Sequence, residues 1–465
     1  RVQTLFVPFQ KLHSEKGYFM KTVIIGGVAA GMSAASKLKR LLKEDVEIVV
    51  YEKGGEVSYG ACGIPFYISD HIKQGRDLIA RTAEEFARSG IPVKTFHEVT
   101  AVDTDKKTVT VTDLHTGRVF EDTYDKLVIG SGAGVRHFPP FDQSYDNLFE
   151  IRDVADGTRI KQSLQDEGQK NVVITGAGFI GLEVSESCKK YRKNVTVIEL
   201  ADHVLSSFDP EVSQALEEEL ERGGVAVRTK TRVIELISRD NRIEKVVVEN
   251  DGVREEIPAD IVINSAGIAP ATSFIQNIEK AKNGAIYVNE RMETSIPDVY
   301  AAGDCSIMRS AVTGEYTYAP LGTNANKQGR IIGDILGGAE PKPFKLIGSS
   351  ALRLFGMDAA KTGISEKEAR ALGLSYKAHT ITGNSYASYY GSEKLNIKVI
   401  YDAETRKLLG AQAYGQGIVV PRVNYYAIAI YSGLTVDEMG FMDLCYSPPF
   451  SGVWDAALIA SNTAK

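Results

Sequence analysis

One cysteine, Cys62, lies where redox chemistry is expected, within residues 57–67, Val-Ser-Tyr-Gly-Ala-Cys-Gly-Ile-Pro-Phe-Tyr. Pro65 is typical of a first helical turn, so the sequence predicts a helix that begins just after the cysteine. Because a helix N-terminus favours thiolate over thiol, we expect Cys62 to be nucleophilic and able to exchange electrons. An isolated cysteine is more often a small buried hydrophobic residue, so this prediction depends on the motifs around Cys62.

The other three cysteines are Cys188, Cys305 and Cys445, and no two of the four form a C-x-x-C pair. This spacing predicts neither a disulfide framework nor a zinc site, and we expect no metal. Unpaired cysteines favour a reducing compartment, which makes the cytoplasm the expected location. Cys188 and Cys305 are expected in the core, whereas the role of Cys445 stays open.

Two glycine-rich turns each lie between an apolar strand and a helix, an arrangement that binds a dinucleotide pyrophosphate. The first spans residues 26–31, where Val28 replaces the middle glycine, and Glu52 ends the next strand. The second spans residues 176–181 with all three glycines, and Glu199 ends its next strand. Each acid is expected to bind ribose hydroxyls. No arginine adjoins Glu199 to bind a 2′-phosphate, which favours NADH over NADPH.

These turns require parallel sheets to hold them. Apolar runs predict strands at residues 21–25, 46–51, 171–175 and 195–198, and Ala-rich sequence predicts a helix through residue 42. The chain has 465 residues, 43% of them hydrophobic, which indicates two to four α/β domains. Strand-like and helical patterns after residues 341–343 predict an α+β domain at the end of the chain.

The charge and the first residues limit the partners that we expect. A net charge of -6 does not favour nucleic acid. Residues 1–19 hold only a short apolar run, broken by Pro8, which is too brief for a signal peptide or a membrane span. We interpret Met20 as the natural start, residues 1–19 as an extension or tag remnant, and the protein as independent of membranes.

Residues 294–304, Thr-Ser-Ile-Pro-Asp-Val-Tyr-Ala-Ala-Gly-Asp, form an apolar strand that runs into Gly-Asp. With the two glycine turns in this order, residues 20–465 resemble the pyridine nucleotide-disulfide oxidoreductase family, in its single-cysteine branch. The resemblance implies two Rossmann-like domains, one for FAD (residues 20–144 and 268–338) and one for NAD (residues 145–267). It also implies a C-terminal dimerisation domain (residues 339–465) and a homodimer.

The family's cofactor residues carry over position by position. For FAD, the resemblance implies Gly26, Gly27, Ala30, Gly31, Glu52, Lys53, Ser131, Gly132, Gly303 and Asp304. For NAD, it implies Gly176, Gly178, Phe179, Ile180, Gly181, Glu183, Glu199 and Gly267. In this set Phe179 matches an aromatic gate and Glu183 matches an acid near the nicotinamide.

Disulfide reductases of this family carry two cysteines spaced C-x-x-x-x-C, whereas Cys62 has no partner at that spacing. Its oxidised form is therefore either a mixed disulfide with a small thiol or a sulfenic acid. The first alternative resembles coenzyme A disulfide or persulfide/polysulfide reductases, which share Cys-Gly-Ile-Pro-Phe-Tyr and the Tyr-Ser-Pro-Pro of residues 446–449. In those relatives Tyr446 and a tyrosine of the pair Tyr389–Tyr390 reach the partner subunit's cysteine, and Tyr446 would donate a proton to the leaving thiolate.

Coenzyme A also needs contacts for its phosphates, and the resemblance points to Ser33, Lys37, Arg40 and Ser58. Ala61 departs from the asparagine that some coenzyme A disulfide reductases carry, so the acceptor stays open among coenzyme A disulfide, coenzyme A persulfide and polysulfide.

Two alternatives use the same nucleotide units. A water-forming NADH oxidase or NADH peroxidase would cycle Cys62 through sulfenic acid, but those relatives carry a histidine in the first glycine turn, where this chain has Ala29 or Ala30. A non-catalytic NAD-binding redox sensor would keep both units, and the intact context of Cys62 disfavours it.

Overall fold

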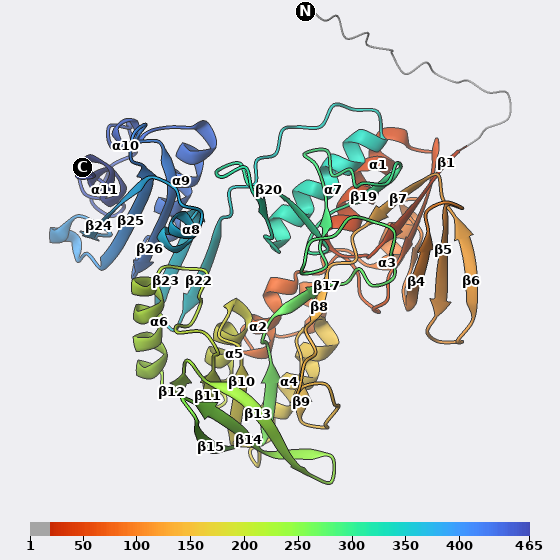
Figure 1. The fold of residues 1–465 in the computed structure, drawn as a ribbon, viewed down its shortest axis with the longest axis horizontal. Helices are drawn as coiled ribbons and strands as arrows, with labels where there is room; N and C mark the ends of the chain where they lie inside the picture. The colour runs from red at the N-terminus through yellow and green to blue at the C-terminus, as the bar shows by residue number, and fades with distance from the viewer. Residues whose placement is uncertain (1–18) are drawn as a thin grey trace, which may run out of the picture.

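The computed structural model describes residues 19–465, so most of the expected extension, residues 1–18, lies outside the described residues. Figure 1 shows three bodies: a first sheet unit on the right, a second below it, and a C-terminal domain on the left. Two Rossmann-like units followed by a C-terminal α+β domain confirm the predicted fold class.

The first unit is built on a parallel sheet of order β19-β7-β1-β2-β3. Its strands are buried on both faces, which explains their near-continuous apolar sequences. Ile25 pairs with Tyr51 on one side and with Ile129 on the other, so the carboxyl ends of the central strands align. The elements are β1 (Met20–Ile25), α1 (Ala29–Leu42), β2 (Val46–Tyr51), β3 (Val93–Lys94), β7 (Lys126–Ile129), β19 (Val299–Ala301) and α7 (Gly322–Leu336).

The helices α1 and α7 lie against each other over most of their length. A side chain at Gly329 of α7 would overlap the backbone carbonyl of Ala30, and one at Gly333 would press on Lys37. Glycines on α7 therefore let the two backbones approach closely. Beside this sheet lies the antiparallel sheet β4 (His97–Asp103), β5 (Thr108–Asp113) and β6 (Val119–Thr123).

The second unit repeats the plan with a parallel sheet of order β12-β11-β10-β16-β9. Its elements are β9 (Leu148–Phe149), α4 (Val154–Gln165), β10 (Asn171–Thr175), α5 (Phe179–Lys190), β11 (Asn194–Ile198), α6 (Pro210–Arg222), β12 (Val225–Arg228) and β16 (Ile261–Asn264). An antiparallel sheet again adjoins it, made of β13 (Arg232–Arg239), β14 (Arg242–Asn250) and β15 (Val253–Pro258). The two units are joined by the antiparallel pair β8 (Ala133–Val135) and β17 (Ile268–Pro270).

The C-terminal domain has one antiparallel sheet of order β22-β23-β26-β25-β24 with helices around it. Its elements are β22 (Ser350–Leu354), β23 (Met357–Gly363), α8 (Glu366–Ala371), β24 (Tyr376–Asn384), η3 (Ser388–Tyr390), β25 (Lys394–Asp402), β26 (Leu408–Gly415), α9 (Val420–Ser432), α10 (Val436–Gly440) and α11 (Ala456–Asn462). Capping boxes begin α8 at Ser365 and α10 at Thr435.

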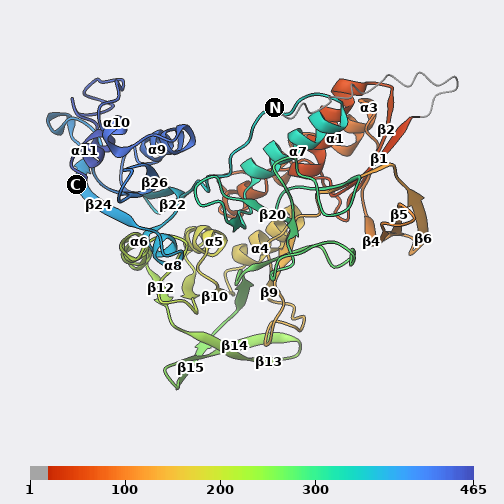
Figure 2. The same cartoon turned by 45° about the horizontal axis from the view of Figure 1, so that its top comes forward.

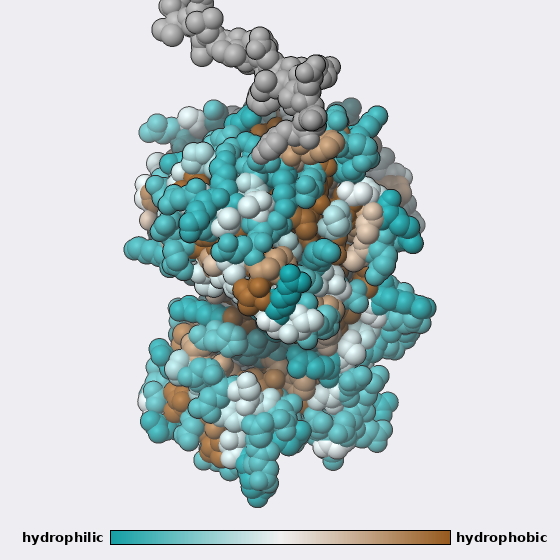
Figure 3. Space-filling model, turned by 90° about the vertical axis from the view of Figure 1, so that its right-hand side faces the viewer, coloured by the Kyte–Doolittle hydropathy of each residue, from teal (hydrophilic) through white to brown (hydrophobic). Residues whose placement is uncertain are grey.

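Short elements complete the described chain: η1 (Ala61–Gly63), α2 (Ile64–Ile68), η2 (Gly75–Leu78), α3 (Ala83–Arg88), β18 (Ile286–Tyr287), β20 (Ser306–Arg309) and β21 (Tyr316–Thr317). Within residues 19–465, no helix combines the length and the apolar character that crossing a membrane requires. Seen from the side, the face over the two sheet units is mostly hydrophilic and is hollowed where the upper and lower lobes meet (Figure 3).

Candidate active site

The two glycine turns have the same backbone geometry. Gly26 and Gly176 have φ of +99° and +88°, a region that side chains rarely adopt. Gly31 and Gly181 each sit so close to the carbonyl oxygen of the first glycine that a side chain would overlap it. Only glycine fits these positions, so both helices begin directly beneath the carboxyl end of a central strand.

The acids after the second strands hold these turns in place. Glu52 accepts hydrogen bonds from the backbone N–H of Gly27 and Gly54, both at 2.6 Å. Glu199 accepts the equivalent bonds from Ala177 at 2.7 Å and Ala201 at 2.9 Å. Each acid thus lies beside its glycine turn, and its binding to ribose hydroxyls stays a prediction.

The space in front of the turns fits a bound dinucleotide. A side chain built on Gly178, Gly132 or Gly267 would meet no atom within 4 Å, so the backbone borders open space there. The N–H groups at the start of α1 and α5 face this space with the positive end of each helix dipole. The residues present therefore fit the two nucleotides that the sequence predicts.

The remaining FAD candidates have defined partners. Gly303 donates from its backbone N–H to Gln328 Oε1 at 2.7 Å, and its Cα lies beside Ala30. Ser131 donates to the Ala271 carbonyl at 2.7 Å. Lys53 forms an ion pair with Glu98, so its charge is directed toward β4.

Cys62 lies in the short 3-10 helix η1, immediately before α2. The residue is exposed, yet its sulfur lies deep enough that burial raises the thiol pKa, and the charges of Glu183 and Asp304 raise it further. The structure thus brings together a cysteine, an acid from α5 and the acid after β19. The sequence predicted that the start of α2 would favour the thiolate, whereas burial, followed by the charges of Glu183 and Asp304, raises the pKa of the thiol.

The pKa of Glu183 is itself shifted. Burial, together with the neighbouring charge of Glu186, raises the pKa of Glu183 to about 7. Burial also raises the pKa of Asp304. At neutral pH, Glu183 is therefore able to hold or release a proton close to Cys62. Phe179 and Ile180 stand at the start of the same helix, and the Phe179 ring meets that of Phe208 edge-on at 6.2 Å.

A cavity of about 570 Å³ opens between α1, α7 and the loop that leads to Cys62. Three of the four residues that the resemblance implies for coenzyme A, Ser33, Arg40 and Ser58, line it. The other lining residues include two that the sequence did not single out, Asn326 and Arg330. Ser33 Oγ donates to Asn326 Oδ1 at 2.7 Å, which ties the two walls together.

Lys37 is not among the residues that line this cavity. Its Nζ lies 2.8 Å from Asp334 Oδ1, and its stem packs on Gly333 of α7. The cation that completes the cavity is instead Arg330, four residues after Asn326 on α7. Their spacing of four residues places Asn326 and Arg330 on one face of a helix, and this can be read from the sequence. That the face borders the cavity follows only from the packing of α7 on α1.

Tyr389 and Tyr446 come together on the C-terminal domain, with their hydroxyl oxygens 3.4 Å apart. This hydrogen bond raises the pKa of Tyr389, whose side chain is 76% exposed. Within the described residues of one chain, no hydrogen bond joins either tyrosine to Cys62. The tyrosine pair is therefore free on the surface for contact with another molecule.

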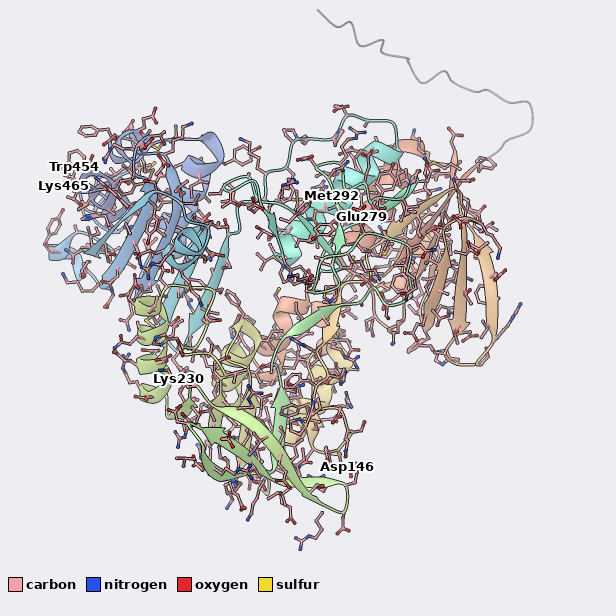
Figure 4. The ribbon with its side chains drawn as sticks, in the orientation of Figure 1. Asp146, Lys230, Glu279, Met292, Trp454 and Lys465 are labelled. Carbon is pink, nitrogen blue, oxygen red and sulfur yellow. The ribbon has the colours of Figure 1, made fainter. Side chains whose placement is uncertain are left out.

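The C-terminal domain also exposes large apolar side chains. Phe441 is 80% exposed and Val453 is 72% exposed, and the Phe441 ring meets that of Trp454 at 6.0 Å. Figure 4 shows Trp454 on the outer side of the domain, away from the two sheet units. Among the cysteines, Cys188 and Cys305 are buried as expected, and Cys445 is exposed. Within the described residues, no His, Cys, Asp and Glu side chains cluster as metal ligands.

Comparison with known proteins places these features in context. The family model for pyridine nucleotide-disulphide oxidoreductases matches residues 20–329, and the model for their dimerisation domain matches residues 351–458. An NADH oxidase from Methanocaldococcus jannaschii is 33% identical over 96% of this chain and 98% of its own length. The coenzyme A disulfide reductase of Staphylococcus aureus is 30% identical over 96% of this chain and 100% of its own length. The NAD(P)H coenzyme A polysulfide/persulfide reductase of Pyrococcus horikoshii is 34% identical over 96% of this chain and 98% of its own length.

Two solved structures share the whole fold. Reduced Bacillus anthracis CoADR-RHD superposes with a TM-score of 0.91 at 30% identity, covering 96% of this chain and 80% of the other. The NAD-dependent persulfide reductase of A. fulgidus superposes with a TM-score of 0.90 at 33% identity, covering 95% and 82%.

Proposed function

The chain belongs to the pyridine nucleotide-disulphide oxidoreductase family, and we propose that it reduces coenzyme A disulfide, or a coenzyme A persulfide or polysulfide, through Cys62. The family uses FAD and NAD(P)H, which fits the two glycine turns and their acids. We propose that the first turn binds FAD and that the second, with Glu199, prefers NADH.

The cavity between α1 and α7 carries this proposal. Arg40 and Arg330, two guanidinium groups suited to phosphates, both line it. Ser58 and Gly60, which precede Cys62 by four and two residues in the chain, line it as well. A ligand that joins a phosphorylated nucleotide to a distant thiol matches such a cavity, and coenzyme A is a ligand of that kind.

The chemistry assigned to the chain's own residues is thiol–disulfide exchange. The Cys62 thiolate attacks one sulfur of coenzyme A disulfide, so that a Cys62–coenzyme A disulfide forms and the first coenzyme A thiolate leaves. When bound, FAD supplies the electron pair of NADH that reduces this mixed disulfide and returns Cys62 to the thiolate while the second coenzyme A is released. The carboxyl of Glu183 is placed to take up or give a proton near the sulfur.

The proton for the leaving thiolate is assigned to the tyrosine pair. Because Tyr389 and Tyr446 are exposed and have no hydrogen bond to Cys62 within the described chain, we assign their contact to the Cys62 of a second copy. Homodimerisation through the apolar surface of residues 441–454 would bring the two sites together. The four free cysteines support a reducing compartment, for which we propose the cytoplasm.

A second function, NADH oxidase, is favoured by the name of the relative from M. jannaschii. It would pass electrons from NADH to oxygen with Cys62 as a sulfenic acid. The first glycine turn offers Ala29 and Ala30 in place of a histidine, so the cavity beside Cys62 supports the disulfide reductase more strongly.

Anaerobic and aerobic assays of the holoenzyme separate the two functions. We expect NADH oxidation without oxygen to require coenzyme A disulfide or persulfide, and to be lost in Cys62→Ser. A rate that depends on oxygen alone, and that added coenzyme A disulfide does not change, would assign the oxidase function instead.

A further inference from the structure

The helix that follows Cys62 packs against the second nucleotide unit, although the sequence places it within the first. Ile64 and Ile68 of α2 are 1% and 0% exposed, and they share a core with Leu182 and Cys188 of α5. The helices α4 and α5 both contact α2. The position of Cys62 therefore depends on side chains of another unit, since a helix of five residues does not hold itself in place.

Hydrogen bonds from α5 hold the backbone of this helix. Ser187 Oγ lies 2.9 Å from the Pro65 carbonyl and 2.9 Å from the Glu183 carbonyl on its own helix, so the two carbonyls share its single proton. The Tyr191 hydroxyl, just after α5, donates to the Ile68 carbonyl at 2.8 Å. The last carbonyls of a helix lack hydrogen-bond partners within it, and the Tyr191 phenol supplies a partner for one of these carbonyls in α2.

A third contact comes from α4. Lys161 forms an ion pair with Asp70 at 2.9 Å, and its Nζ lies 4.4 Å from the centre of the Tyr67 ring. Lys161 is 7% exposed, so this charge is fixed beneath the end of α2. Every one of these contacts comes from the second unit, and none is made by a residue that contacts the cavity between α1 and α7.

We propose that Tyr191 and Ser187 are positioning residues for Cys62, which hold α2 at a set distance from α5 and thereby hold the sulfur near Glu183. Glu183 lies one turn before Ser187 on the same helix. A hydroxyl that locks α2 onto α5 therefore also fixes the separation between the cysteine and the acid. This assignment rests on Cys62 being the reacting group of the proposed function.

Removal of one hydroxyl tests the assignment without opening a cavity. Tyr191→Phe keeps the ring but releases the Ile68 carbonyl, and Ser187→Ala releases the Pro65 carbonyl. When α2 loosens, water reaches the sulfur and Glu183 recedes, so we expect the pKa of Cys62 to fall. In the reduced holoenzyme, iodoacetamide should modify the Cys62 peptide about threefold faster at pH 7. Turnover of coenzyme A disulfide should fall about tenfold, with little change in KM.

Two controls distinguish positioning from damage. Tyr376→Phe removes a phenol that donates to Glu366 Oε1 at 3.1 Å in the C-terminal domain. In this variant, the rate of Cys62 alkylation and the turnover of coenzyme A disulfide should equal those of the wild type. Reduction of ferricyanide by NADH reports the nucleotide and flavin sites without Cys62, and Tyr191→Phe should retain it. The proposal would be overturned if both hydroxyl variants were alkylated and turned over at the wild-type rates. It would also be overturned if ferricyanide reduction fell by the same factor as coenzyme A disulfide turnover. If wild type does not reduce coenzyme A disulfide, the proposed function fails, and the alkylation rates still decide the role of Tyr191.

Discussion

At the scale of single residues, the chemistry gathers around side chains that lie far apart in the sequence. Cys62, Glu183 and Asp304 come from three segments, and burial together with the two carboxylates raises the pKa of the thiol. The sequence identified all three, because each follows a recognisable strand or turn. It did not show that the acids oppose the helix dipole, since that depends on distances set by the fold. Asn326 and Arg330 were missed because nothing in the sequence places α7 against α1.

Arg330 is expected to bind a phosphate of coenzyme A. In Arg330→Ala, the KM for coenzyme A disulfide should rise about tenfold while kcat changes little, because this contact is equally present before and during reaction. Steady-state kinetics of purified holoenzyme measure both constants. Lys327→Ala, which removes a neighbouring exposed cation outside the cavity, is the matched control. Equal effects of the two substitutions would show that general charge, not the cavity, attracts the substrate.

Glu183 should make stability depend on pH. Its pKa of about 7 in the folded protein exceeds the ordinary value, so the folded state holds a proton that the unfolded state releases. The stability contributed by this proton is complete below about pH 4.5 and is lost as the pH rises toward 7. Glu183→Gln should therefore be more stable than wild type by about 1–3 kcal/mol at pH 8, with the gain shrinking toward pH 5.

Urea unfolding at pH 5 and pH 8 measures the effect of Glu183→Gln. The exposed Glu221→Gln on α6 should show no pH-dependent difference from wild type. A constant difference at both pH values would mean that the substitution acts through packing and not through the proton.

At the scale of elements, the apolar runs predicted the strands on either side of each glycine turn, β1, β2, β10 and β11, and the helices between them. These elements are long and strictly patterned, so local sequence suffices. The helix after Cys62 was also expected, yet its attachment to α4 and α5 was not, because five residues carry no periodicity. A second joint between bodies lies where the starts of α6 and α8 meet, because the backbone N–H groups of Glu366 and Lys367 donate to the carboxylate of Asp209. Figure 2 shows the two helices next to each other.

Lys398 stabilises the joint between the second unit and the C-terminal domain. Its Nζ contacts Glu211 and Glu366 at 2.6 Å and Asp209 at 3.0 Å, and its side chain is 7% exposed. Lys398→Met would leave Asp209 and Glu211 without their cation and Glu366 with Arg370 alone, at a cost of about 3–5 kcal/mol in unfolding free energy. Denaturant unfolding measures this loss, and Lys367→Met, an exposed neighbour, serves as the control. Equal stability of both variants would show that water already screens the cluster.

At the scale of the whole molecule, the C-terminal domain forms a body of its own beside the two sheet units (Figure 1), and the tyrosine pair is exposed on its surface. The resemblance of the sequence to its family predicted this surface as a subunit interface. Composition alone could not predict this surface, because the contacts of Tyr389 with Tyr446 and of Phe441 with Trp454 form only in the folded domain.

Phe441→Asp should disrupt the homodimer by placing a charge in the apolar surface. Analytical ultracentrifugation is expected to show a monomer that has lost coenzyme A disulfide reduction but keeps ferricyanide reduction by NADH. Val119→Asp, which places the same charge on an exposed apolar residue of β6, should leave the dimer intact. A fully active Phe441→Asp monomer would show that the tyrosines of a second copy are not needed.

The most direct test of the account is the intact mass of the purified, non-reduced protein, compared between wild type and Cys62→Ser. We predict an adduct with the mass of one coenzyme A in wild type, removable by dithiothreitol and absent from Cys62→Ser. Added oxygen on Cys62 without coenzyme A, or a coenzyme A adduct that persists in Cys62→Ser, would contradict the assignment of Cys62 as the site of the mixed disulfide.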